Sequence, residues 1–104
     1  MSAVSAMDLL QRGVDQAAAA AWNGSGEFWV TTDLHRANWF ARSHPGSPPA
    51  ARFEFDLTQG SLVAILNLFP SGAVQHGTSD YELLPVSYAL LNIAMINRQV
   101  VLLP

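Results

Sequence analysis

Apolar positions near the start of the chain recur at the spacing of a helix. They are Met7, Leu10, Val14 and Ala18. A run of five alanines overlaps them, and alanine is the strongest helix former. The pattern therefore predicts a helix over residues 7–21, with Gly13 as a weak point in its middle. Asn23 and the glycines that follow it favour a turn that ends this helix.

A short aromatic strand and a second helix are expected next. Bulky and β-branched residues over 27–31 predict the strand. Thr32 or Asp33 can then cap a helix that runs to about Arg42, because both side chains accept hydrogen bonds from the first helical turn. The apolar side chains that this helix is expected to turn toward the core are Leu34, Ala37, Phe40 and Ala41.

The second half of the chain alternates between short apolar runs and polar turns. Pro-Gly and Pro-Pro pairs predict a loop over 44–49, and alternating residues over 52–57 predict a half-buried strand. The apolar run Leu62–Leu68 fits either a buried strand or a short helix, since periodicity alone does not separate the two. The remaining expected elements are a polar loop over 70–80, a strand over 81–84, a helix from Ser87 through Asn97 and a strand over 100–103.

Together these elements predict one small α+β domain over residues 1–104. We expect a small mixed or antiparallel sheet with two to three peripheral helices. Half of the residues are hydrophobic and 12% are charged, so the chain has the composition of a folded domain with a core.

Charge and hydropathy narrow the range of partners. The net charge is −3, there is no lysine, and the five arginines are scattered, so we expect no nucleic-acid partner. No apolar run reaches the roughly 20 residues that span a bilayer, and the first residues lack the basic segment of a secretory signal. Localisation stays open. A mean hydropathy of +0.20 suggests a protein partner or a second copy that covers apolar surface.

The sequence offers little for a metal or a phosphate-binding loop. His35, His44 and His76 are far apart, and none stands at ligand spacing from another histidine or a carboxylate. The chain also lacks cysteine, so we expect no metal site. The Gly-Ser-Gly of residues 24–26 precedes a strand instead of following one, which is the wrong context for a phosphate cradle.

Two hydroxyl groups stand where the aromatic strand meets the next helix. Thr31 and Thr32 close the strand, so hydroxyl donors and an aromatic surface meet at the mouth of the helix. This arrangement suits a polar small molecule that carries a ring. It also suits an ordinary strand-to-helix turn.

Two carboxylates follow at the start of a later strand, in Asp80-Tyr81-Glu82. Strand alternation places Asp80 and Glu82 on one face and Tyr81 on the other. Two such groups can act on one ligand, one bonding a sugar hydroxyl and the other orienting a nucleophile or stabilising a developing positive charge. The alternative is a solvated strand start in which Asp80 makes a local turn.

In their order, these pieces resemble the ADP-ribosyltransferase fold, in particular its small bacterial toxin-type branches. The segment FWVTTDLHRANWFA resembles the family's aromatic strand, its Ser/Thr-rich end and the helix that follows. ARFEFDLTQGSLVAIL resembles the next strand and turn, and DYE is similar to the carboxylate motif. The resemblance covers roughly residues 9–86. It implies a domain that binds NAD and either transfers ADP-ribose or hydrolyses NAD.

The resemblance also implies roles for particular residues. Glu82 is the implied catalytic glutamate, which bonds the nicotinamide ribose and favours an oxocarbenium-like transition state, and Asp80 is the auxiliary group that positions the acceptor. The residues implied to bind NAD are Phe28, Trp29, Thr31 and Thr32. Trp29 stands where some members have a tyrosine that stacks on nicotinamide. The family's first-strand arginine or histidine has no clear counterpart ahead of the aromatic strand.

Two other classes of function fit the same sequence. One is a non-catalytic interaction module, of an immunity or regulatory type, that binds a protein through its apolar surface. The other is a homodimer that binds a small ligand without chemistry. Trp22, Trp29 and Trp39 suit each of these roles, because tryptophan is common in cores, interfaces and ligand pockets alike.

Overall fold

The computed structural model describes residues 1–23, 27–43 and 49–104, apart from the side chains of Trp22 and Asn23. The predicted turn after Asn23 and most of the predicted 44–49 loop lie outside these residues. The elements in chain order are α1 (Ala3–Arg12), α2 (Gln16–Asn23), β1 (Phe28–Thr31), α3 (Leu34–Ser43), β2 (Ala51–Asp56), α4 (Gln59–Leu66), β3 (Ala73–His76), β4 (Asp80–Leu83), the 3-10 turn η1 (Pro85–Ser87), α5 (Tyr88–Ala94) and β5 (Ile96–Leu102).

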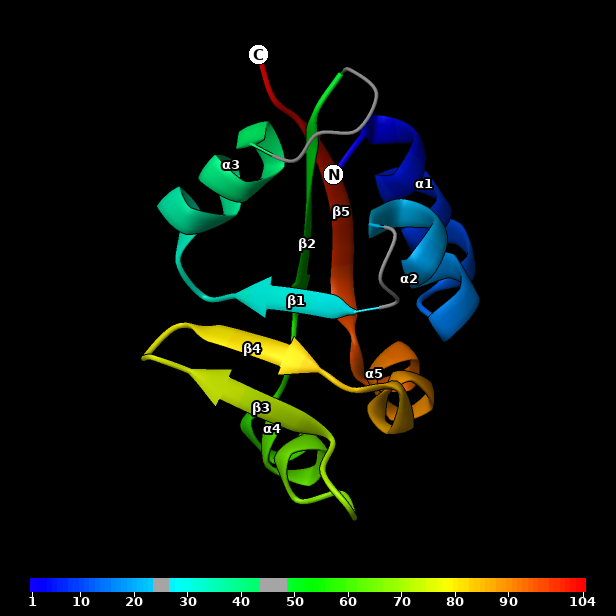
Figure 1. Ribbon diagram of the computed structural model, residues 1–104, viewed down its shortest axis with the longest axis vertical. Helices are drawn as coiled ribbons and strands as arrows, with labels where there is room; N and C mark the ends of the chain where they lie inside the picture. The colour runs from blue at the N-terminus through cyan, green and yellow to red at the C-terminus, as the bar shows by residue number, and fades with distance from the viewer. Residues whose placement is uncertain (24–26, 44–48) are drawn as a thin grey trace.

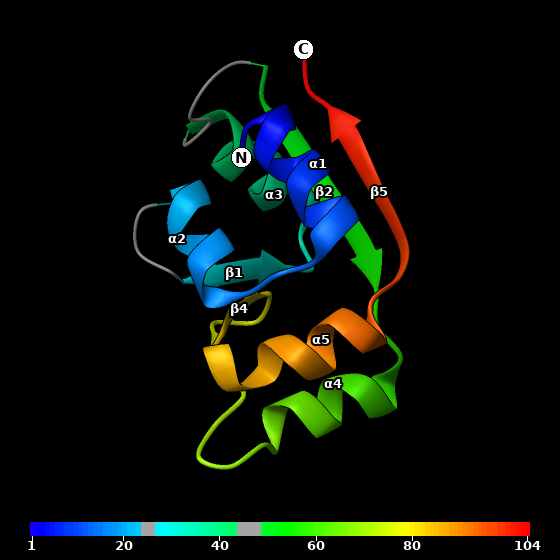
Figure 2. The same cartoon turned by 90° about the vertical axis from the view of Figure 1, so that its right-hand side faces the viewer.

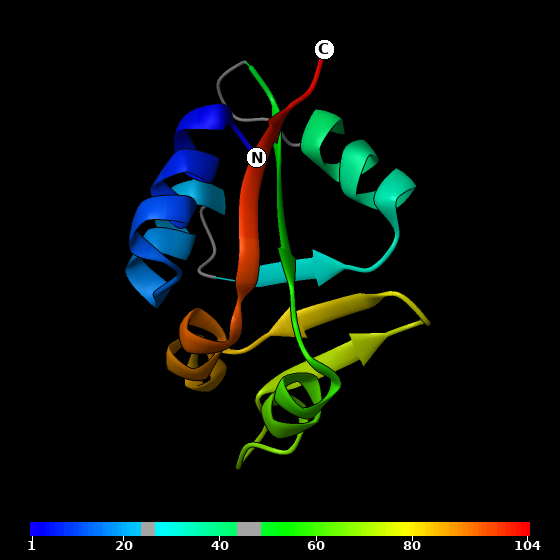
Figure 3. The same ribbon diagram turned by 180° about the vertical axis from the view of Figure 1, so that it is seen from behind.

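The predicted α+β class is confirmed, with two small antiparallel sheets and, in the described ranges, five α-helices where two to three were expected. One sheet has the strand order β1-β4-β3, and the other is the two-stranded ribbon β2-β5. In Figure 1 the three-stranded sheet crosses in front of the ribbon, and Figure 3 shows the ribbon from behind, nearer to the viewer than β1. The two sheets therefore form separate layers.

The helices surround these layers. α1 packs along β2 and β5, while α3 packs against β1 and β2 from the opposite side (Figure 1). α4 and α5 lie side by side at the other end of the molecule, where Figure 2 shows them below the ribbon. None of the helices in the described ranges is long and apolar enough to cross a membrane.

The prediction of one helix over residues 7–21 is wrong, because Gly13 ends α1. Gly13 has a φ of 76°, and its N–H donates to the carbonyl of Leu9 at 2.9 Å, which closes the last turn of the helix. The side chain of Asn92 then holds Val14 by both backbone groups, each at 2.8 Å. Asp15 restarts the chain as α2 by accepting the N–H of Ala18 at 2.7 Å.

Two further boundaries differ from the sequence prediction. The expected polar loop over 70–80 contains β3, a strand that pairs with β4 along its whole length. The last helix ends at Ala94, not at Asn97, and β5 already begins at Ile96. The ambiguous run Leu62–Leu68 is mostly helical, in α4, whose first turn is capped by Thr58. The extents of β3 and β5 depend on pairing with other strands, which a local pattern cannot show.

The core lies between the three-stranded sheet and the helices. Its buried members include Leu9, Val14, Ala19, Phe28, Ile65, Leu83, Tyr88, Leu91 and Met95. The expectation that α3 turns Leu34 and Phe40 inward is wrong, since their exposed fractions are 55% and 39%. Ala41 is the buried residue of α3, and small side chains let this helix approach β1 and β2 closely.

Candidate functional site

The two faces of the three-stranded sheet differ in chemistry. Cross-strand partners in register share a face, and residues two apart on a strand share it too. The pairs Trp29↔Glu82 and Thr31↔Asp80 join β1 to β4, and the pair His76↔Asp80 joins β3 to β4. These residues therefore define one face of the sheet, which we call the open face. Its candidate residues are Trp29, Thr31, Asp80, Glu82 and His76. The expectation that Asp80 and Glu82 share a face is confirmed by this register.

The opposite face, which we call the core face, carries Phe28, Leu83 and Ala73, all of them buried. Phe28 is 6% exposed and meets the ring of Tyr88 edge-on, with centroids 6.3 Å apart. Burial raises the pKa of the Tyr88 phenol. The side chain of Phe28 thus points away from the open-face candidates and into the core.

Asp80 is bound to α3 through Arg36. The Arg36 Nε donates to both carboxylate oxygens, at 3.0 and 3.1 Å, and its Nη2 donates to Oδ2. The Ser79 hydroxyl donates to Oδ1 at 3.1 Å. Hydrogen bonding to Arg36, aided by Thr31 and Ser79 and opposed by burial, lowers the pKa of Asp80 to about 2. Asp80 is therefore an ionised anchor between the sheet and the helix.

Both threonine hydroxyls serve the turn between β1 and α3. Thr31 Oγ1 accepts the N–H of Asp33 at 3.2 Å, and Asp33 in turn accepts the N–H of Arg36 at 3.0 Å, which caps the helix. The backbone N–H of Thr32 donates to the carbonyl of Ser79 at 2.9 Å, and its hydroxyl lies 3.5 Å from the same oxygen. The hydroxyls thus stabilise the strand-to-helix turn.

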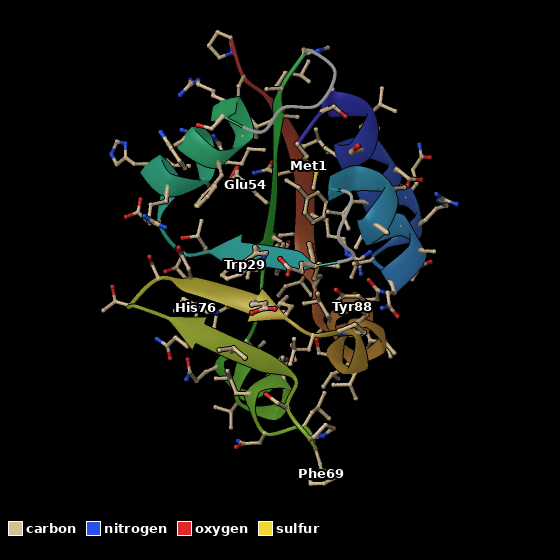
Figure 4. The ribbon with its side chains drawn as sticks, in the orientation of Figure 1. Met1, Trp29, Glu54, Phe69, His76 and Tyr88 are labelled. Atoms are coloured by element: carbon tan, nitrogen blue, oxygen red, sulfur yellow. The ribbon has the colours of Figure 1, made fainter. Side chains whose placement is uncertain are left out.

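Trp29, His76 and Glu82 form a contact cluster on the open face, and Figure 4 shows Trp29 and His76, which belong to it. The rings of Trp29 and His76 are tilted by 43° with centroids 4.6 Å apart, although they come from the two outer strands. His76 Nε2 lies 3.4 Å from Glu82 Oε1 on the central strand. The indole Nε1 donates to Glu27 Oε2 at 3.0 Å. Trp29 remains 47% exposed, so an aromatic surface flanked by a carboxylate and an imidazole faces outward.

His76 was not among the site residues expected from the sequence. It lies in the segment expected to be a polar loop, and its contact with Glu82 depends on β3 pairing with β4. His35 lies on α3, and His44 lies outside the described residues. Within the described residues there is no group of three or more side chains suited to hold a metal ion.

A groove of about 650 Å³ lies between β1, α3 and the start of β2; we call it the α3 groove. Of the residues that the resemblance assigns, its wall includes Phe28, Trp29, Thr31 and Asp80. A second space of about 480 Å³, the inner cavity, lies under the start of α3 and includes Thr32. Glu82 lies outside both walls, directly across the strand pair from Trp29.

Arg52 is a wall residue of both spaces that the sequence analysis did not select. Its side chain is only 16% exposed. Nη1 donates to Asn38 Oδ1 at 2.6 Å, and Nη2 donates to Glu54 Oε1 at 3.0 Å. Its position on the polar side of an alternating strand was visible in the sequence, but its burial beneath α3 was not.

The comparisons with known proteins add no family to this picture. No protein-family model matches the chain, and no match was found among the curated proteins or the solved structures.

Proposed function

We propose that this domain binds NAD in the α3 groove and transfers its ADP-ribose or hydrolyses it, as the resemblance to ADP-ribosyltransferases implies. One observation carries the proposal: Phe28, Trp29, Thr31 and Asp80, assigned to the site by sequence alone, border a single groove. Glu82, the implied catalytic residue, is the cross-strand partner of Trp29. Trp29 and Asp80, which are 51 positions apart in the sequence, thus border one space.

The groove has suitable size and chemistry for such a molecule. Its volume of about 650 Å³ lies within the usual range for small-molecule pockets. Its wall combines aromatic side chains, Phe40 and Trp29, with two guanidinium groups, Arg36 and Arg52. Aromatic rings suit a base or a nicotinamide, and guanidinium groups suit phosphate oxygens.

Glu82, His76 and Asp80 would have different roles in the reaction. NAD supplies a glycosidic bond to a positively charged nicotinamide, a good leaving group. Glu82 would bond a ribose hydroxyl and stabilise the positive charge that develops on the sugar. His76, 3.4 Å from Glu82, limits the directions that this carboxylate can take. Asp80 is bound by Arg36, so its part would be to hold α3 beside the groove and not to position an acceptor.

Thermal unfolding with and without millimolar NAD tests the binding. We expect NAD to raise the melting temperature, because a ligand that binds the folded state stabilises it. NAD should also change the tryptophan fluorescence of the wild type, and this change should be lost in Trp29→Phe. The absence of any thermal shift with millimolar NAD would overturn the proposal.

Turnover is tested separately with Glu82→Gln. The amide keeps the size of the side chain but loses its charge, so we expect release of nicotinamide to be abolished while NAD binding largely persists. Asp8→Asn on α1 is the matched control, because it removes a carboxylate paired with Arg12 away from the groove. Full turnover in Glu82→Gln would contradict the assigned role.

A second candidate function is an interaction module or a homodimer. Several large apolar side chains are exposed, and Phe69, Ile93 and Val4 are exposed by 92%, 83% and 78%. Such surface favours a partner that covers it. The mass in solution and co-purification test this alternative. A monomer that purifies without a partner would count against it.

A further inference from the structure

Arg52 lies where the two spaces beneath α3 meet. The walls of the α3 groove and the inner cavity share four residues, Val30, Thr31, Ala37 and Arg52. Arg52 is the charged residue among these four, and only 16% of its side chain is exposed. A ligand in either space would therefore border the Arg52 side chain.

The hydrogen bonding of Arg52 differs from that of two other arginines. Arg12 and Arg36 each direct their Nε and Nη2 groups at both oxygens of one carboxylate, on Asp8 and Asp80. On Arg52 the same edge donates one bond, from Nη2 to Glu54. The Arg52 Nε is buried and has no hydrogen-bond partner. This is the one such side-chain atom among the described residues.

An acceptor for this edge is expected on physical grounds. Buried N–H groups in native proteins nearly always have a partner, and an orphan one points to a bound water, ion or ligand. Glu54 is already shared, because it also accepts from Gln99 Nε2 at 3.3 Å. At another edge of the guanidinium, Nη1 donates to Asn38 Oδ1 at 2.6 Å. The protein thus orients the guanidinium, and the Nε–H of one edge remains without an acceptor.

We propose that Arg52 binds an oxyanion, a phosphate or carboxylate group of a small ligand, at the junction of the α3 groove and the inner cavity. The planar edge of a guanidinium matches the paired oxygens of both groups, and charge assistance makes these hydrogen bonds strong. Because Nε is covered by neighbouring atoms, binding requires the guanidinium to turn so that this edge borders the ligand. The site does not require the ligand to be NAD, and it extends to any small molecule with such a group.

The side-chain Nε–H signals of ¹⁵N-labelled full chain test the proposal directly. The chain has five arginines and no lysine, so the spectrum is simple, and Arg52→Lys assigns the signal of interest. The probes are inorganic phosphate, pyrophosphate and acetate. We expect the Arg52 signal to shift with saturation for the phosphates, for acetate or for both, which identifies the group. Arg42, exposed on α3, is the reference for non-specific effects.

Two variants sharpen the result. Glu54→Gln removes the competing charge and should strengthen anion binding several-fold, whereas Arg52→Lys should weaken it at least tenfold while preserving the positive charge. Arg42→Lys is the matched control and should change nothing. The proposal is overturned if the Arg52 signal stays fixed with all three anions, or shifts linearly as that of Arg42 does.

The outcomes also separate this site from the proposed function. Saturable pyrophosphate binding at Arg52 without any thermal shift by NAD would support the oxyanion site and reject NAD. A thermal shift by NAD that persists in Arg52→Lys, with no response of Arg52 to the anions, would support NAD binding and reject the oxyanion site.

Discussion

The core face and the open face of the three-stranded sheet are made by alternate residues of the same short strands. Phe28 and Leu83 are buried on one face, while their chain neighbours Trp29 and Glu82 lie on the other. The core face makes apolar contacts with Tyr88 and other buried residues of the helices. The open face carries an exposed indole, an imidazole and carboxylates. In the strand pair β1–β4, one set of side chains thus packs the core, and the alternate set exposes polar and aromatic groups.

The strongest test of this contrast compares adjacent residues of β1. We expect Phe28→Ala to lower the free energy of unfolding by about 3–5 kcal/mol, because it removes a buried aromatic ring and leaves a cavity. Trp29→Ala should cost less than about 1 kcal/mol, since half-exposed side chains contribute little. Chemical denaturation measures both. Equal losses would show that the two faces do not differ in their contribution to stability.

A second pair tests whether burial, and not apolar character, makes the difference. Leu83 is 3% exposed on the core face, and Val74 is 40% exposed on the open face. We expect Leu83→Ala to lower the free energy of unfolding by about 2–5 kcal/mol. Val74→Ala should change it by about 0.5 kcal/mol. Urea denaturation of the two variants provides the check, and a large effect at Val74 would contradict it.

Asp80 is the exception on the open face, because it stabilises the fold. Its pKa is lowered from 3.8 to about 2, so the folded state favours the ionised carboxylate. The stabilisation is complete above the unfolded pKa of about 4 and is lost as the pH falls toward 2. We therefore expect the wild type to exceed Asp80→Asn in stability at neutral pH, and this difference to shrink on acidification.

Urea denaturation of both proteins between neutral pH and about pH 2 measures this difference. Asp8→Asn, which breaks the exposed Asp8–Arg12 pair on α1, is the comparison variant. A difference between wild type and Asp80→Asn that stays constant over this range would contradict the role of the Asp80 carboxylate.

The smallest effect on stability is expected for the contact cluster. His76→Asn and Glu82→Gln should each change the free energy of unfolding by less than about 0.5 kcal/mol, because both positions are at least partly exposed and both replacements keep a polar side chain. His76→Asn should nevertheless change the tryptophan fluorescence, because the imidazole lies against Trp29. Trp39→Phe is a control that leaves this contact in place. Unchanged fluorescence together with a large loss of stability would reverse our interpretation of this face.

Local patterns were sufficient for part of the fold. The strands β1, β2 and β4 and the helix α3 fall close to the predicted ranges, since alternation, β-branched residues and a capping aspartate act over a few residues. The prediction of a single helix over 7–21 failed because Gly13 ends α1 and the next residue, Val14, is bound by Asn92, 78 positions away in the sequence. β3 was missed because its polar sequence becomes a strand through pairing with β4.

The candidate site divides in the same way. Alternation alone placed Asp80 and Glu82 on one face, as the register confirms. The partners of these carboxylates, Arg36 and His76, come from other elements and were not foreseen. The sequence also did not indicate that Arg52 is buried beneath α3.

The sequence by itself determined the α+β class, the order of most elements and the alternation of side chains along each strand. Those properties depend on backbone geometry and on neighbours a few residues apart. The tertiary structure decided which carboxylate is bound to an arginine, which histidine meets Trp29 and which guanidinium lies between two cavities. Such contacts depend on the packing of distant segments, and packing brings specific atoms within hydrogen-bond distance only after the chain has folded.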